Sequence, residues 1–117
     1  MITILNYAAM LATIAFGLIA WIKPRYAMKK LDLKTDGSTL GLSEIRAANG
    51  ALFVGIAVAA LLINAPLGFA MVGFAYAGAA VGRGTSIILD GSGQTTSYAF
   101  IAVEIALAAY LILAHLL

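Results

Sequence analysis

Four long apolar runs, joined by short polar segments, occupy most of the 117-residue chain. The first run, residues 2–22, contains no charged side chain. As an α-helix it would be about 31 Å long, which is enough to cross a hydrocarbon core of roughly 30 Å. The other runs lie at about 44–64, 67–89 and 98–117. We therefore expect an all-α integral membrane four-helix bundle, built as a single transmembrane domain over residues 1–117.

The composition of the chain supports this fold class. Hydrophobic residues make up 63% of the sequence. Charged residues make up only 10%, against about 25% in a typical soluble domain. A small soluble fold has too much surface to cover with so few charges. The soluble, disordered and fibrous classes are therefore excluded.

A cleaved signal peptide is the competing interpretation of the first run. Such a peptide begins with basic residues and has a shorter apolar stretch. The start of this chain, MITILNY, carries no basic side chain, and its apolar run is too long. We therefore interpret residues 2–22 as a span that is retained.

The connection over residues 23–43 carries five of the seven Lys and Arg residues of the chain. Pro24 suits the first turn of a helix. Ala27, Met28 and Leu31 would then share one apolar face, which favours a short interfacial helix in the headgroup region. We expect the basic side chains of this connection to contact lipid headgroups; they are Lys23, Arg25, Lys29, Lys30 and Lys34.

Short polar sequences mark the expected helix ends. Asp36-Gly37-Ser38 indicates a turn. Ser43 is suited to cap the next helix, with Glu44 in its first turn. Ala65-Pro66 makes a tight connection between the second and third runs, and residues 90–97 form a polar turn before the fourth.

The distribution of charge predicts the orientation. The 23–43 connection is basic, whereas the connection between the second and third runs has no basic side chain. The positive-inside rule then places the 23–43 loop in the cytoplasm and both termini on the periplasmic side of a bacterial inner membrane. The basic residues are few, and they are confined to one loop beside the bilayer. They therefore do not indicate nucleic-acid binding.

Ionisable side chains within the last two runs are candidate functional residues. Arg83 lies seven residues before Asp90, and Glu104 lies seven residues after Ser97. Both are therefore about 10 Å along their helices from the same polar turn. Since an uncompensated charge at that depth costs at least a few kcal/mol, we expect Arg83 and Glu104 to pair.

Further polar residues are expected in the same half of the bundle. Tyr76, Arg83 and Asp90 recur at intervals of seven, with Ser86 close to that stripe. The predicted intramembrane polar cluster consists of Glu44, Arg46, Asn49, Arg83, Ser86, Asp90 and Glu104. Three interpretations stay open: a pair that fixes helix register, an ion or substrate site, or no pairing at all.

No catalytic, cofactor or metal site is predicted. The chain lacks cysteine, which excludes disulfides and thiolate metal sites. His115 is the single histidine, which excludes bis-His haem ligation within one copy, and we expect it at the outer interface. Tyr7 and Trp21 are interpreted as interface anchors. Gly78-xxx-Gly82 would permit close helix contact.

Two segments carry a resemblance to a known family. RAANGALFVGIAVAALL (46–62) resembles the start of the second helix in a bacterial four-helix membrane family catalogued as a domain of unknown function. VGRGTSIILDG (81–91), followed by a helix with Glu104, is similar to the second motif of that family, which is distantly like the DoxX-like four-helix proteins. The resemblance implies motif positions at Arg46, Asn49, Gly50, Gly82, Arg83, Asp90 and Glu104.

Three functions are weighed. The first is a non-enzymatic accessory subunit of a larger membrane complex, respiratory or photosynthetic for example. The second is a small oligomeric transporter or channel that uses an Arg83/Glu104 site; small multidrug exporters are of similar length, but the Glu of their first helix is missing here. The third is a membrane enzyme, for which we find no nucleophile–base pair or dinucleotide motif. The expected partners are the lipid bilayer and a larger complex or further copies of the chain.

Overall fold

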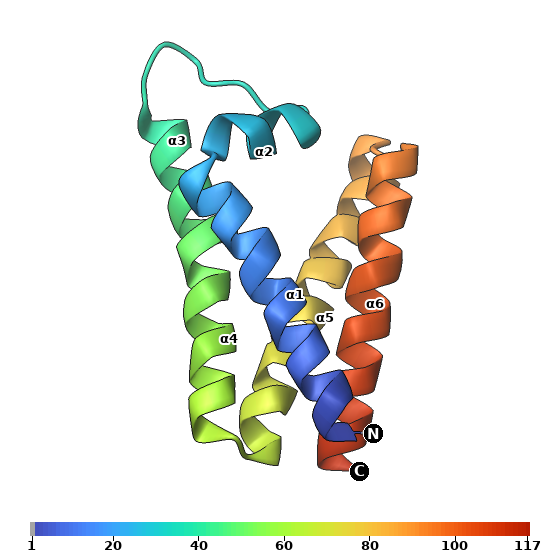
Figure 1. Cartoon of the computed structure of the whole chain (residues 1–117). Coiled ribbons are helices and arrows are strands. Elements are labelled where there is room, and N and C mark those ends of the chain that lie inside the picture. The colour runs from blue at the N-terminus through green and yellow to red at the C-terminus, as the bar shows by residue number, and fades with distance from the viewer. Residues whose placement is uncertain (1) are drawn as a thin grey trace. The chain divides into compact units, whose positions relative to one another are not determined.

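The computed structural model describes residues 2–117, and this part of the chain is helical and contains no strand. Figure 1 shows the elements in order along the chain. They are α1 (Ile2–Ile22), α2 (Pro24–Lys30), α3 (Leu40–Glu44), the π-helical segment η1 (Ile45–Ala51), α4 (Leu52–Ile63), α5 (Pro66–Asp90) and α6 (Thr95–Leu116). The predicted all-α class is confirmed.

Within residues 2–117, four helical stretches are long and apolar enough to cross a bilayer. They are Ile2–Ile22, Leu40–Ile63, Pro66–Asp90 and Thr95–Leu116. The second stretch is one continuous helix made of α3, η1 and α4. Each predicted run therefore corresponds to one stretch, with ends that differ by up to four residues.

The second stretch begins earlier than the sequence indicates, and the prediction that Ser43 caps it is wrong. Thr39 is the residue before the first turn, and the Leu40 N–H donates to Ser38 Oγ at 3.3 Å. Ser43 and Glu44 lie inside α3. Tertiary packing accounts for the difference, because Leu42 contacts an apolar cluster that includes Ile45 and thereby extends the helix toward its N-terminus.

The described chain divides into two compact units, one over residues 3–62 and one over residues 63–117 together with Ile2. We call them the N-terminal and C-terminal units. The expectation of a single domain over 1–117 stays a prediction.

In the N-terminal unit, α1 and the second stretch contact each other through their backbones. A Cβ atom added at Gly17 would lie 2.8 Å from the carbonyl oxygen of Gly50 and 2.9 Å from Val54 Cγ2. A Cβ atom added at Gly50 would lie 2.6 Å from the backbone nitrogen of Trp21. Only glycine fits at these two positions without movement of the opposing backbone.

Helix α2 is the predicted short helix after the first span. Pro24 lies in its first turn, as expected, and Met28 is buried with Ala20 of α1 and Ile45 of η1. Figure 1 shows α2 running crosswise to α1 from the upper end of that helix. The contact of Met28 with Ala20 and Ile45 holds the basic connection against the ends of the first and second spans.

In the C-terminal unit, α5 and α6 form an antiparallel hairpin (Figure 1). The polar turn is shorter than the predicted 90–97, because α5 runs to Asp90 and α6 starts at Thr95. Gly91, with φ of 65°, ends α5 in the left-handed conformation typical of a helix C-terminus. Asp90 remains helical and accepts a hydrogen bond from Ser86, one turn earlier.

Helices α5 and α6 approach each other closely at Gly73. A Cβ atom added there would lie 2.9 Å from Leu111 Cβ and 3.0 Å from Ile112 Cγ1. A Cβ atom added at Gly78 or Gly82 would meet nothing within 4 Å. Within the described residues the hairpin therefore makes no close contact through Gly78 or Gly82, and it uses Gly73 instead.

Candidate intramembrane polar site

Arg83 of α5 and Glu104 of α6 form a bidentate ion pair. Arg83 Nε donates to Glu104 Oε1 and Arg83 Nη2 donates to Glu104 Oε2, both at 2.9 Å. The Glu104 side chain is 11% exposed and that of Arg83 is 31% exposed. The predicted pairing is thus present, in the fork geometry that gives Arg–carboxylate pairs their strength and fixed orientation.

An aromatic ring completes the surroundings of the guanidinium group. Arg83 Cζ lies 5.0 Å from the ring centroid of Phe100, which is one turn before Glu104 on α6. A cation over an aromatic face is attracted by about 0.5–2 kcal/mol, depending on how far it is removed from water. One helix therefore supplies both the carboxylate and the ring that hold Arg83.

A second polar group lies at the α5–α6 turn. Ser86 Oγ donates to Asp90 Oδ2 at 2.9 Å and lies 2.7 Å from Ser92 Oγ. Because the Ser86 hydroxyl has a single proton and gives it to Asp90, Ser92 must be the donor in the second bond. These two hydrogen bonds connect the last helical turn of α5 to the loop between α5 and α6. The acceptor at the end of the chain is the exposed carboxylate of Asp90.

The remaining predicted site residues belong to the N-terminal unit. Arg46 Nη1 donates to the carbonyl oxygen of Trp21, near the end of α1, at 2.6 Å. Arg46 and Asn49 both lie in η1, and Glu44 directly precedes it; all three are exposed. Single π-helical turns within α-helices are often found at functional sites, and here the turn coincides with the RAANG sequence.

Some of the predicted site residues therefore contact each other, but the seven residues belong to two different units. Arg83 contacts Glu104, and Ser86 contacts Asp90, in the C-terminal unit. Glu44, Arg46 and Asn49 belong to the N-terminal unit. The seven-residue cluster as a whole therefore stays a prediction.

Three participants were not found from the sequence. Phe100 could have been found, since it precedes Glu104 by four residues and so shares its helix face. Ser92 could have been found less readily, because it lies in a turn whose length was overestimated. The Trp21 carbonyl oxygen could not have been found, because a backbone acceptor carries no signature in the sequence.

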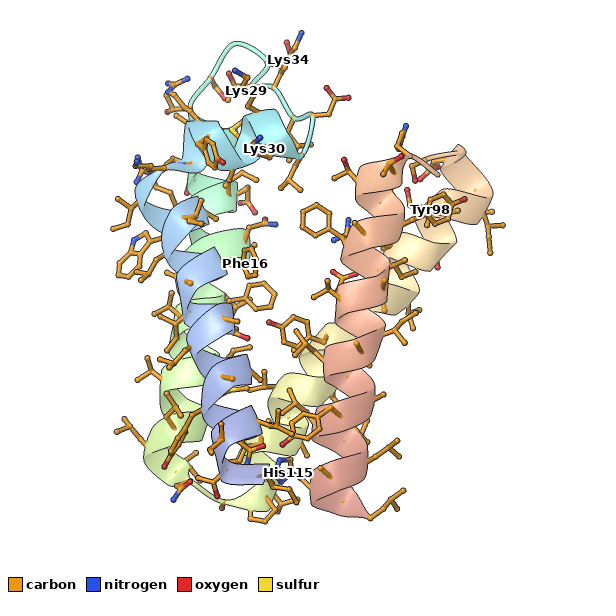
Figure 2. The ribbon with its side chains drawn as sticks, turned by 45° about the vertical axis from the view of Figure 1, so that its right-hand side comes forward. Phe16, Lys29, Lys30, Lys34, Tyr98 and His115 are labelled. Atoms are coloured by element: carbon orange, nitrogen blue, oxygen red, sulfur yellow. The ribbon has the colours of Figure 1, made fainter. Side chains whose placement is uncertain are left out.

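His115 lies among aromatic rings near the other end of the hairpin. Its ring stacks on Phe69 at a centroid distance of 5.2 Å, and Tyr110 contacts it edge-on at 6.2 Å. Figure 2 shows His115 at the end of α6 remote from Tyr98. Among residues 2–117, no group of three or more His, Cys, Asp or Glu side chains is placed to hold a metal ion.

The length and apolar composition of the long helices define the class of protein. Four candidate spans within residues 2–117 are those of a multi-pass integral membrane protein. The chain matches the family described as Domain of unknown function (DUF4345) over residues 1–115, and it belongs to that family. Neither a curated protein nor a solved structure matches the chain.

Proposed function

We propose that this protein is a small, non-enzymatic accessory subunit of a larger membrane complex, of the respiratory or photosynthetic kind. Polar side chains that remain exposed on apolar helices carry this proposal. Arg46 and Asn49 are exposed on η1, within the second span, and the Arg83 side chain is 31% exposed within the third. Such groups are costly against acyl chains and almost always face protein or water.

The open glycines of α5 support the same proposal. Gly78 and Gly82 lie one turn apart on exposed helix surface, with nothing within 4 Å of an added Cβ. Small residues at this spacing let the backbone of another helix approach closely. A subunit that docks in a complex needs such a face together with polar groups that fix its register.

The first test is to extract the protein from its native membrane in mild detergent, size it, and identify what accompanies it. Co-migration with a large assembly at a fixed ratio is expected. Asn49→Leu, which removes an exposed amide, should release the subunit from the assembly. Leu62→Ala, at a position 81% exposed in the same span, should leave it bound. Migration of the unchanged protein alone would overturn the accessory role.

The alternative is a small oligomeric transporter or channel in which Arg83 and Glu104 bind the substrate or a proton. The pair favours this alternative because it places a guanidinium in the third span and a carboxylate in the fourth. In proteoliposomes loaded with a pH-sensitive dye, Glu104→Gln should abolish proton flux while the protein remains folded. Asp36→Asn, in the exposed loop, is the control and should conduct normally. Absence of flux in the unchanged protein would count against proton transport.

For location, we propose a bacterial inner membrane with the 23–43 loop in the cytoplasm and both termini in the periplasm. Because the chain lacks cysteine, single introduced thiols report orientation without background. In intact cells a membrane-impermeant maleimide should label Asn64→Cys and leave Asp36→Cys unlabelled. The opposite pattern would reverse the topology.

A further inference from the structure

Helix α2 ends in a way that turns the following chain back over its own last turn. The Leu33 N–H donates to the Met28 carbonyl oxygen at 2.8 Å, and the Asp32 N–H donates to that of Lys29 at 3.3 Å. Asp32 has φ of 59°, in the left-handed region. Together these bonds form a Schellman motif, in which glycine is the usual left-handed residue. Aspartate is among the few residues other than glycine that tolerate this conformation.

The reversal creates a basic pocket of about 380 Å³ beside α2. Arg25 and Lys29 are four residues apart and share one face of the helix, and the reversed chain adds Lys34. Met28 and Leu33 supply an apolar wall, and Asp32 is the single carboxylate. Three basic residues therefore line one pocket.

Two other basic side chains of the same connection do not line this pocket. Lys23 precedes α2, and the Lys30 Nζ atom lies over the Tyr26 ring, 5.6 Å from its centroid. Figure 2 shows Lys29 and Lys34 beside the loop that follows α2, with Lys30 lower on the helix. We expected all five basic residues of the connection to contact headgroups. In the structure three of them line a pocket and two do not.

The position of the pocket is fixed relative to the membrane spans. Met28 contributes to its wall and is also buried with Ala20 and Ile45, which belong to the first and second spans. An apolar wall beside a group of cations, at the ends of two spans, suits a ligand with a charged head and an apolar continuation.

We infer that this pocket binds a phosphate group, supplied by the headgroup of an anionic phospholipid. Arg25 is suited to bidentate contact with two phosphate oxygens, and Lys29 and Lys34 act as point charges. Met28 and Leu33 would contact the glycerol end of the lipid. This inference is independent of the proposed accessory role.

The test is a lipid titration of the whole protein in detergent, with bound lipid counted by native mass spectrometry. Phosphatidylglycerol should bind more tightly than phosphatidylcholine. Arg25→Gln, Lys29→Gln and Lys34→Gln should each weaken phosphatidylglycerol binding by about fivefold, which corresponds to about 1 kcal/mol per charge. The matched controls Lys23→Gln and Lys30→Gln should change it by less than about twofold.

Asp32→Asn is a variant that should raise the affinity for phosphatidylglycerol instead of lowering it. Asparagine tolerates the left-handed conformation as well as aspartate does, so the Schellman motif is retained. Removal of the carboxylate should tighten phosphatidylglycerol binding by about fivefold. A gain of affinity cannot come from misfolding, which keeps the inference testable even if a charge-removing variant is unstable.

Each outcome decides the inference. Equal losses for all five Lys and Arg variants would mean diffuse attraction to an anionic surface and would overturn the pocket. Equal binding of phosphatidylglycerol and phosphatidylcholine would also overturn it. Inorganic phosphate should displace the lipid from the unchanged protein but should not displace the lipid that still binds to Lys34→Gln. This result would confirm phosphate recognition. Binding of inorganic phosphate without any preference for phosphatidylglycerol would assign the pocket to a soluble phosphate compound and overturn the lipid as its source.

Discussion

In the N-terminal unit the long helices meet backbone to backbone, whereas in the C-terminal unit α5 and α6 are also joined by a charged pair of side chains. Gly17 and Gly50 bring α1 and η1 together so closely that Arg46 can donate directly to the Trp21 carbonyl oxygen. In the hairpin, Arg83 and Glu104 satisfy each other across the helix interface.

The two arrangements respond differently to substitution. A backbone contact depends on the absence of atoms, so it is sensitive to added volume and indifferent to charge. An ion pair depends on two groups at once, so removal of either one leaves the other uncompensated. The first kind of interface is tested by adding a methyl group, and the second by removing one charge and then both.

The largest effect is expected from Glu104→Ala. It leaves the Arg83 guanidinium without its carboxylate inside a span and should destabilise the protein by about 3–5 kcal/mol. Thermal unfolding in detergent, followed by loss of the monodisperse peak in size-exclusion chromatography, would measure the effect. The double variant Arg83→Leu/Glu104→Leu should recover most of the stability if the pair is purely structural. A double variant as unstable as the single one would contradict that interpretation.

A smaller loss is expected from Gly50→Ala. The new Cβ atom would lie 2.6 Å from the Trp21 backbone nitrogen, so α1 and η1 must separate, at about 1–3 kcal/mol. Gly55→Ala is the matched control on the same helix, because a Cβ atom there meets nothing within 4 Å. It should be neutral or stabilising by up to about 1 kcal/mol. Equal melting temperatures for the two variants would show that the backbone contact does not hold this unit together.

The smallest effect is expected from Phe100→Leu. It removes the ring over Arg83 but keeps an apolar side chain and the ion pair, so the loss should be about 0.5–2 kcal/mol. Phe74→Leu, on an exposed position of α5, is a control for loss of aromatic area. A difference of less than a few tenths of a kcal/mol between them would mean that the ring contributes packing alone.

The candidate site was predictable to the extent that it depends on spacing along regular helices. Arg83 and Glu104 were placed at one depth by counting residues from a common turn, and they pair even though that turn is shorter than predicted. The pairing is unaffected because α5 extends only one residue and α6 only three residues into the predicted turn, which is less than one helical turn in each case. The prediction that Ser43 caps the second span is wrong, because the position of a helix end depends on which neighbours pack against it.

The sequence by itself determined the class of the protein and its spans, because burial in a bilayer demands uninterrupted apolar runs of a set length. It also predicted Glu104 as the partner of Arg83, because an isolated charge inside a span is costly to leave unpaired, and the structure contains that pair. Only the tertiary structure decided that Arg46 binds the Trp21 carbonyl oxygen. Only the tertiary structure, too, divided the basic residues into three that form a pocket and two that do not. These features depend on backbone atoms and on one left-handed residue, Asp32, and backbone conformation at single residues is decided by packing rather than by side-chain pattern.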